Sequence, residues 1–247
     1  MLKKALGTFQ LAEKDKARCK LLLADIYLRQ GEIWEASLLY SQVEKDYKYE
    51  ALGDQAKFKN AKIYFYTGDY NWAKAQLDVL KGSTSKLIAN DAMRLSLIIS
   101  DNLAFDTAGA ALRDYAKASL QFEQNDLNGA LNSLQSMERI YLAHSIIDEV
   151  YYLEYSIYFN MQNYEKAAAA LNVIVRDYPE DILGDEAVFN LAVLYEQYLN
   201  QPEKAKEMYK KLISVYPGSI HVAESRKRYR AYENGKGELK FEEADPK

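Results

Sequence analysis

The stretch from Asp148 to Pro217 carries one pattern twice, and this repetition constrains the fold more than any other feature of the sequence. Each copy has two apolar segments joined by a short polar turn, and the apolar residues recur at intervals of three and four. Such intervals place side chains on one face of a helix, so each copy predicts a hairpin of two helices. The copies contain Tyr151, Tyr155, Tyr158, Ala167, Leu171 and Ile174, and then Leu191, Ala192, Tyr195, Ala205, Tyr209 and Leu212. Because one hairpin cannot bury both of its faces, the copies should stack on one another.

Three further copies lie upstream, the third of them weaker than the others. They contain Ala24, Tyr27, Gly31, Ala36 and Tyr40; Ala61, Tyr64, Gly68, Ala73 and Leu77; and Ala118, Asn125, Ala130 and Leu134. We expect Gly31 to adopt the left-handed conformation of a helix end. The sequence from Leu52 to Phe58 also returns in large part from Leu183 to Phe189, which supports the repetition independently.

This order of residues resembles the tetratricopeptide repeat family. The family pattern has a small residue and an aromatic in the first helix, glycine near the turn, alanine early in the second helix and proline at the end. Tyr178-Pro179 and Tyr216-Pro217 supply such endings, and the resemblance covers most of residues 17–217. It implies an all-α fold, a right-handed α-α superhelix (solenoid) of about five helical hairpins with an extra irregular helix and a C-terminal capping helix.

The distance between copies is 37 residues from Ala24 to Ala61, against about 34 in the usual unit. The excess falls in loops such as Asp177 to Asp185. These loops, and the ending after Tyr216, are similar to repeats of Gram-negative envelope proteins, namely outer-membrane assembly lipoproteins and the Tol-Pal coordinator. The similarity implies a bacterial, periplasmic or envelope-associated protein, and a cytoplasmic location stays open. Lys3 and Lys4 precede too short an apolar run for a signal peptide, so we expect none on this chain.

The copies and the breaks between them predict six segments. These are a remnant or capping helix at 1–16, two hairpins at 17–87, an irregular helix and loop at 88–110, three hairpins at 111–217, a capping helix at 218–233 and a disordered tail at 234–247. Within the third segment, Asp101 to Gly109 reads as a loop, and the segment is either a degenerate repeat or an insertion specific to a partner. In the capping helix, we expect the basic residues to face solvent: Arg226, Lys227, Arg228 and Arg230.

The N-terminal segment has a repeat-like pattern of its own. Leu2, Leu6 and Phe9 follow the four-then-three spacing of a second repeat helix, so they should dock against the hairpin that starts near Ala17. One hypothesis is therefore that the chain is the C-terminal part of a longer array.

Composition and motifs exclude several functional classes. The formal net charge of -4 gives no reason to expect nucleic acid, and no apolar run approaches the roughly 18 residues of a membrane span. Cys19 is alone, and neither His144 nor His221 has a metal-type spacing with cysteines or carboxylates. The sequence has no glycine-rich phosphate loop and no nucleophile elbow. We therefore expect no catalytic residue, no cofactor, no metal site and no enzyme activity.

The candidate site is a set of mostly aromatic side chains on the first helices, which in this family line a concave groove. The resemblance places two rows there: Leu21, Phe58, Tyr115, Tyr152 and Phe189, and then Leu28, Phe65, Phe122, Phe159 and Glu196. Lys62, Ser119 and Ser156 lie between the rows. The predicted partner-binding residues are Leu21, Phe58, Lys62, Phe65, Tyr115, Phe122, Tyr152, Phe159 and Phe189. Rigid aromatics suit recognition of a peptide, but the alternative is that they only pack neighbouring hairpins.

The first functional hypothesis is a non-catalytic scaffold that binds a protein or peptide segment in the groove. The second is a structural assembly module that docks through its open ends to an envelope complex or to another copy, as a homo-oligomer. A third and remote one is an accessory to an enzyme acting on envelope polymers. The clamp with which some family members hold a C-terminal carboxylate is not expected, because the comparable places hold Leu21, Asp25 and Phe58.

Overall fold

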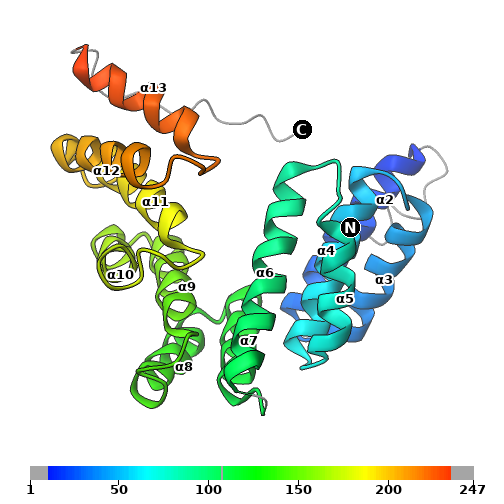
Figure 1. Cartoon of the computed structure of the whole chain (residues 1–247). Helices are drawn as coiled ribbons and strands as arrows, with labels where there is room; N and C mark the ends of the chain where they lie inside the picture. Colours follow the sequence, from blue (N-terminus) through cyan, green and yellow to red (C-terminus); the bar gives the residue numbers. More distant parts are fainter. Residues whose placement is uncertain (1–10, 107, 235–247) are drawn as a thin grey trace. The chain divides into compact units, whose positions relative to one another are not determined.

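The computed structural model describes residues 11–106 and 108–234, and all regular elements in these ranges are α-helices. The helices are α2 (Glu13–Arg29), α3 (Ile33–Asp46), α4 (Ala51–Tyr66), α5 (Tyr70–Leu80), α6 (Lys86–Phe105), α7 (Ala110–Glu123), α8 (Leu127–Ile140), α9 (Ile147–Asn160), α10 (Tyr164–Asp177), α11 (Gly184–Gln197), α12 (Pro202–Val215) and α13 (Val222–Glu233). The predicted all-α fold class is confirmed, with five hairpins, one extra helix and a C-terminal helix (Figure 1). The predicted segments 1–16 and 234–247 fall largely outside the described residues.

The helices belong to two compact units divided between Ile146 and Ile147. Unit 1 contains α2 to α8 and unit 2 contains α9 to α13. The division therefore falls between two hairpins and not at the extra helix α6.

The five hairpins close on the same kind of turn. One residue in each turn has a positive φ, between 49° and 84°: Gly31, Gly68, Asn125, Gln162 and Asn200. Gly31 and Gly68 both have φ of 84°, a conformation that glycine adopts without steric cost. The predicted left-handed conformation of Gly31 is thus confirmed.

A fully buried alanine follows each of these turn residues by five positions. The alanine opens the second helix, and two larger buried side chains follow it at intervals of four and three residues. The five sets are Ala36, Tyr40 and Val43; Ala73, Leu77 and Leu80; Ala130, Leu134 and Met137; Ala167, Leu171 and Ile174; and Ala205, Tyr209 and Leu212. The small alanine permits close approach of the two helices, and the larger residues fill the space beyond it.

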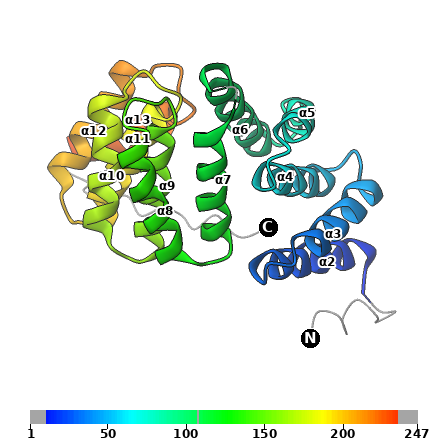
Figure 2. The same ribbon diagram turned by 90° about the horizontal axis from the view of Figure 1, so that it is seen from below.

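In unit 1 the first helices stay together although α6 intervenes in the sequence. α6 packs mainly against α5, whereas α7 packs against α4 (Figure 2). The rings of Phe65 on α4 and Tyr115 on α7 meet edge to face, with centroids 6.3 Å apart. The first helices α4 and α7 are therefore neighbours, as consecutive copies of the repeat should be.

The loop predicted from Asp101 to Gly109 is wrong in its first half, because α6 continues to Phe105. Asn102, a residue type that often ends helices, is buried and satisfied inside the helix. Its Nδ2 donates a hydrogen bond to the carbonyl oxygen of Ile98 at 2.8 Å. The Ser145 hydroxyl donates to its Oδ1 at 2.9 Å.

The repeated Leu-Gly-Asp sequence of units 1 and 2 has a packing cause. A Cβ on Gly53 would lie 2.0 Å from the backbone oxygen of Tyr47, and one on Gly184 would lie 2.4 Å from that of Pro179. In each case the incoming loop crosses the start of a first helix too closely for any side chain. Glycine is therefore required at both places.

Candidate functional site

Three of the predicted groove residues of unit 1 belong to its core. Leu21, Phe65 and Tyr115 are all buried, and Phe65 has only 2% of its surface exposed. The Phe65 ring also packs against Tyr70 at a centroid distance of 5.8 Å. These side chains therefore pack against neighbouring helices inside unit 1. Phe58, Lys62 and Phe122 are half-buried and keep part of their surface at the exterior of unit 1.

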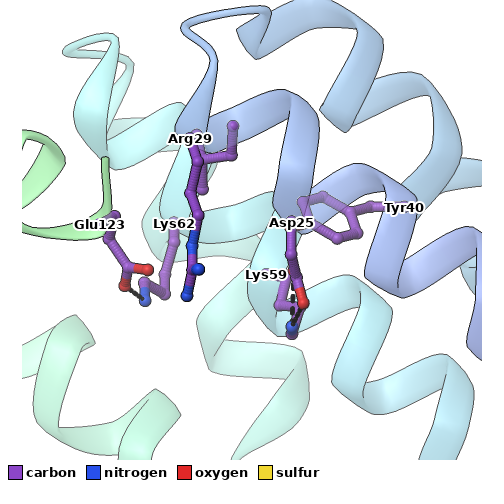
Figure 3. Close-up of a pocket in the computed structure, with 7 residues that line it drawn as sticks. Asp25, Arg29, Tyr40, Lys59, Lys62 and Glu123 are labelled. Atoms are coloured by element: carbon purple, nitrogen blue, oxygen red, sulfur yellow. Dashed lines mark hydrogen bonds and ion pairs between the residues drawn. The ribbon is translucent and has the colours of Figure 1, made fainter. Parts of the chain in front are cut away.

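A charged pocket of about 220 Å³ lies on the first helices of unit 1 (Figure 3). Its lining comes from α2, α3, α4 and the end of α7: Asp25, Leu28, Arg29, Tyr40, Lys59, Lys62 and Glu123. Lys62 is the one predicted partner-binding residue that lines it. The helical period explains the grouping, because Asp25 and Arg29 lie four residues apart on α2 and Lys59 and Lys62 three apart on α4.

One side of the pocket is an ion pair between α2 and α4. Lys59 Nζ lies 2.7 Å from both Oδ1 and Oδ2 of Asp25. The Tyr40 hydroxyl donates to Oδ1 of the same carboxylate at 2.5 Å. Burial raises the pKa of Tyr40, and the hydrogen bond to Asp25 raises it further, so the phenol remains protonated and acts as a donor. Asp25 is thus held by one cation and one hydroxyl.

The other side is a second pair of the same kind between α4 and α7. Lys62 Nζ is paired with Glu123 Oε1. The Tyr66 hydroxyl donates to the same oxygen at 3.2 Å. Burial raises the pKa of Tyr66 and the nearby Glu123 charge adds to this, so Tyr66 is also a protonated donor. Both carboxylates of the pocket are therefore engaged from within unit 1.

Arg29 differs from the two lysines. Figure 3 shows its guanidinium directed between the Lys62–Glu123 pair and the Lys59–Asp25 pair. The residue is exposed and forms no ion pair with any other residue of the described ranges. The pocket thus holds three cations and two carboxylates, an excess of one positive charge (3 − 2 = 1). Such a site favours an anion, for which arginine offers a planar set of donors.

Unit 2 presents aromatic rings on its first helices instead. Tyr152 and Tyr155 are 5.5 Å apart by ring centroid, and Tyr155 and Phe159 are 6.1 Å apart. Phe159 then meets Tyr198 at 5.1 Å, and Tyr198 meets Tyr164 at 4.5 Å. The predicted residues Tyr152 and Phe159 are half-buried members of this aromatic row, which runs from α9 to the end of α11.

The remaining predicted groove residue, Phe189, is covered by the start of the C-terminal helix. Its ring stacks on His221 with centroids 4.2 Å apart and an interplanar angle of 9°. Glu196 of the second row is fully buried, and Arg228 Nη1 is paired with its Oε2. Tyr209 donates to the same Oε2 at 2.7 Å and Tyr232 to Oε1 at 3.0 Å. α13 therefore closes this end of the row.

The burial of Arg228 corrects the expected solvated face of α13. Arg226, Lys227 and Arg230 are exposed as predicted, but the side chain of Arg228 is only 1% exposed. Arg228 lies three residues from both Ser225 and Ala231, which are buried, and so belongs to the packed face of the helix.

The described residues contain no group of three or more histidines, cysteines, aspartates or glutamates placed to hold a metal ion. In the same residues, no helix combines the length and the apolarity that crossing a bilayer requires.

Comparison with known protein families gives a match that lies in unit 2. The family model of the tetratricopeptide repeat matches residues 156–181 and 186–219, which take in the end of α9, all of α10 and α12 and most of α11. The match to the tetratricopeptide repeat therefore falls within unit 2. No curated protein matched this chain in a sequence search.

Two solved structures show distant similarity to the chain. The MamA protein is 17% identical over 88% of this chain and 95% of its own, with a TM-score of 0.39. YrrB, described as a TPR protein with an unusual peptide-binding site, is 17% identical over 92% of this chain and 97% of its own, with a TM-score of 0.40. At this level the similarities give no guide to a ligand or a partner of this chain.

Proposed function

We propose that this protein is a non-catalytic interaction scaffold that binds a segment of a partner protein along its first helices. Tetratricopeptide repeats are generally interaction modules, and the family model of this repeat matches residues 156–181 and 186–219. The observation that carries the proposal is Arg29, a cation that forms no ion pair within residues 11–106 and 108–234 and is directed into a pocket whose other charged groups are already engaged.

The pocket has the size and charge for one acidic side chain of a peptide. Its volume of about 220 Å³ is below the roughly 300–1,000 Å³ of small-molecule sites. Arg29 can hold a carboxylate in a bidentate manner, and Lys59 and Lys62 add positive potential on either side. Because Asp25 and Glu123 fix the two lysines in advance, an incoming carboxylate orders few side chains.

The aromatic row of unit 2 suits an apolar part of a partner segment. Tyr155, Phe159 and Tyr164 are half-buried and Tyr198 is exposed, so rigid ring surface remains open along α9 and α11. Aromatic side chains bury much area at little cost in conformational entropy.

A bacterial envelope location is also part of the proposal. It is supported by the loop similarity alone, and cell fractionation with an antibody against this chain tests it.

The experiment compares the wild-type chain with Arg29→Glu and with Arg226→Glu as baits in an extract of the native organism. Arg226 is an exposed arginine of α13, so its variant carries the same change in charge away from the pocket. A partner held by the wild type and by Arg226→Glu is then purified, and its affinities are measured by calorimetry. We expect Arg29→Glu to weaken binding by about tenfold or more, since a hydrogen-bonded charge pair is lost. Equal affinities for all three proteins would reject the pocket as the binding site.

A further inference from the structure

A second pocket of unit 1, of about 350 Å³, lies at the second helices α3 and α5. Its lining comes from these two helices, from α4 and from Lys48, which follows α3. It shares no lining residue with the pocket around Arg29. On α4 its residues Lys57 and Tyr64 lie on a different face from Lys59 of the first pocket. The two pockets are therefore separate, and the volume of this one falls within the roughly 300–1,000 Å³ of ligand sites.

Unit 2 has apolar residues at the same places of its repeat. From Gly53 to Gly184 is 131 residues, and the same shift takes three lining residues of the pocket to apolar residues of α10 and α11. Glu44 corresponds to Val175, Lys57 to Val188, and Asn60 to Leu191. The three apolar residues are buried in one cluster, with Val188 and Leu191 at 0% exposure. The pocket of unit 1 is thus polar where unit 2 is packed.

The polar groups of the pocket are ordered by one another. Lys57 Nζ lies 3.0 Å from Glu44 Oε1, with 21% and 27% of the two side chains exposed. The Ser37 hydroxyl donates to Oδ1 of Asn60 at 2.7 Å, and Nδ2 of Asn60 donates to the Ser41 hydroxyl at 3.1 Å. A partly buried ion pair in place of apolar contacts does not normally add stability. The polar lining is therefore explained better by recognition of a ligand than by packing.

Two further lysines of the pocket are available to a ligand. Lys45 and Lys48 are exposed and form no ion pair within residues 11–106 and 108–234. With Lys57 they make three cations against the single carboxylate of Glu44, an excess of two positive charges (3 − 1 = 2). Because Lys57 is already engaged by Glu44, the attraction for an anion comes from Lys45 and Lys48.

An aromatic surface stands beside these cations. Trp72 of α5 has 50% of its surface exposed. Its ring meets Tyr64 of α4 edge to face, with centroids 6.0 Å apart and an interplanar angle of 73°. The indole therefore has a packed edge and an open surface, which suits contact with an apolar side chain.

We propose that this pocket is a second binding site of unit 1 and takes an acidic peptide segment of a partner protein. Carboxylates of the segment pair with Lys45 and Lys48, and a neighbouring apolar side chain packs on Trp72. A nucleic acid fits less well, because its phosphates need a broad basic surface and this pocket has two free cations beside the carboxylate of Glu44. The site is independent of the binding proposed at Arg29.

The test uses the emission of Trp72, one of the two tryptophans of the sequence. In an Arg29→Glu/Trp34→Phe background, Trp72 is the remaining tryptophan and the first pocket has a reversed charge. The probe is a blocked pentapeptide with phenylalanine between two pairs of glutamates, and a second peptide has glutamines in their place. We expect the acidic peptide to shift the emission and to bind about tenfold more tightly or better, since its carboxylates meet unengaged cations.

Charge reversal then tests the two lysines. Added to the same background, Lys45→Glu/Lys48→Glu should weaken binding of the acidic peptide by about tenfold or more, because two attractions become two repulsions. The matched control is Lys86→Glu/Lys117→Glu, whose lysines are exposed in unit 1 outside both pockets, and it should bind like the background protein.

Several results would overturn the proposal. These are an unchanged emission with the acidic peptide, equal affinities for the two peptides, and no effect of Lys45→Glu/Lys48→Glu. An equal loss in the control Lys86→Glu/Lys117→Glu would show attraction by overall charge alone. A short oligothymidylate that binds more tightly than the acidic peptide would assign the pocket to nucleic acid.

Discussion

Arg228 of α13 is paired with Glu196 of α11, and both side chains are almost completely buried, at 1% and 0% exposure. Tyr209 and Tyr232 donate hydrogen bonds to the same carboxylate. The arrangement parallels the pocket of unit 1, where Tyr40 and Lys59 hold Asp25. In both units a carboxylate on the first helix of a hairpin is held by a tyrosine of the second helix of that hairpin. A cation from the helix that follows the hairpin completes the arrangement.

Breaking the buried pair should destabilise unit 2 strongly. Arg228→Met leaves Glu196 charged and buried without its cation, and we expect the free energy of unfolding to fall by about 3–5 kcal/mol. Arg226→Met, on the exposed face, should change it by less than about 0.5 kcal/mol. Urea unfolding followed by circular dichroism measures both. The double variant Glu196→Leu/Arg228→Met should recover much of the loss, and a double variant no better than Arg228→Met would contradict the charge argument.

Overpacking the close helix crossing should destabilise the second helix of the α9/α10 hairpin. Ala167 is fully buried where α10 meets its neighbours, so Ala167→Trp should cost about 1–3 kcal/mol. Ala169 lies on the exposed side of the same helix, and Ala169→Trp is the matched control. Melting temperatures of the two variants give the comparison. If both melt together with the wild type, the assigned register of α10 is wrong.

The hydroxyl of Tyr40 should matter for the pocket side of unit 1. Tyr40→Phe removes the donor to Asp25 while keeping the ring in the core, and we expect a loss of about 1.5–3 kcal/mol, typical of a hydrogen bond to a charged group. Tyr49→Phe makes the same chemical change on an exposed ring. Chemical denaturation of both variants tests this. An equal stability of the two variants would show that the Tyr40–Asp25 bond contributes nothing net.

Glu149 should make the stability of unit 2 depend on pH. Burial raises the pKa of its carboxyl, and the neighbouring Asp148 and Asp181 charges raise it further; its Oε2 has no hydrogen-bond partner in the described ranges. Since the folded state holds this proton more tightly than the unfolded state, the free energy of unfolding falls as pH rises from the unfolded pKa of about 4.3 through the raised folded pKa.

Glu149→Gln removes this titration. We expect the variant to be more stable than the wild type at neutral pH by roughly 1 kcal/mol or more, with the difference shrinking towards pH 4. Glu165→Gln, on the exposed side of α10, should leave the pH profile unchanged. Urea unfolding at several pH values between 4 and 8 measures the effect, and parallel profiles for wild type and Glu149→Gln would refute it.

Much of the fold follows from local patterns. The alanine of each second helix and the larger residues four and seven positions later are buried, as the intervals predict, since helical periodicity alone decides which face is covered. The loop expected from Asp101 was wrong because α6 continues to Phe105, where Asn102 is satisfied within the helix and by Ser145, contacts that no local pattern contains.

The site was less accessible to sequence reasoning. Lys62 was predicted, but its pairing with Glu123 depends on α7 returning to α4 across the inserted α6, over 61 residues of sequence. Arg29 stands in the last turn of α2, a common place for a basic residue, and only the surrounding ion pairs make it distinctive. The burial of Arg228 could not be predicted for the same reason. Which face of α13 is packed depends on its contact with α11, where Glu196 lies.

Because the buried alanines recur at a nearly constant interval, the effect of substitutions should also vary along the chain with that interval. Ala36 and Ala73 are 37 residues apart, as are Ala130 and Ala167, and each is fully buried early in a second helix. A profile of all single substitutions would therefore show narrow minima at a nearly constant interval, with one longer gap of 57 residues between Ala73 and Ala130 where α6 is inserted. The spacing of these alanines thus sets one regular component of the constraint on the sequence, beside the buried residues that each hairpin has of its own.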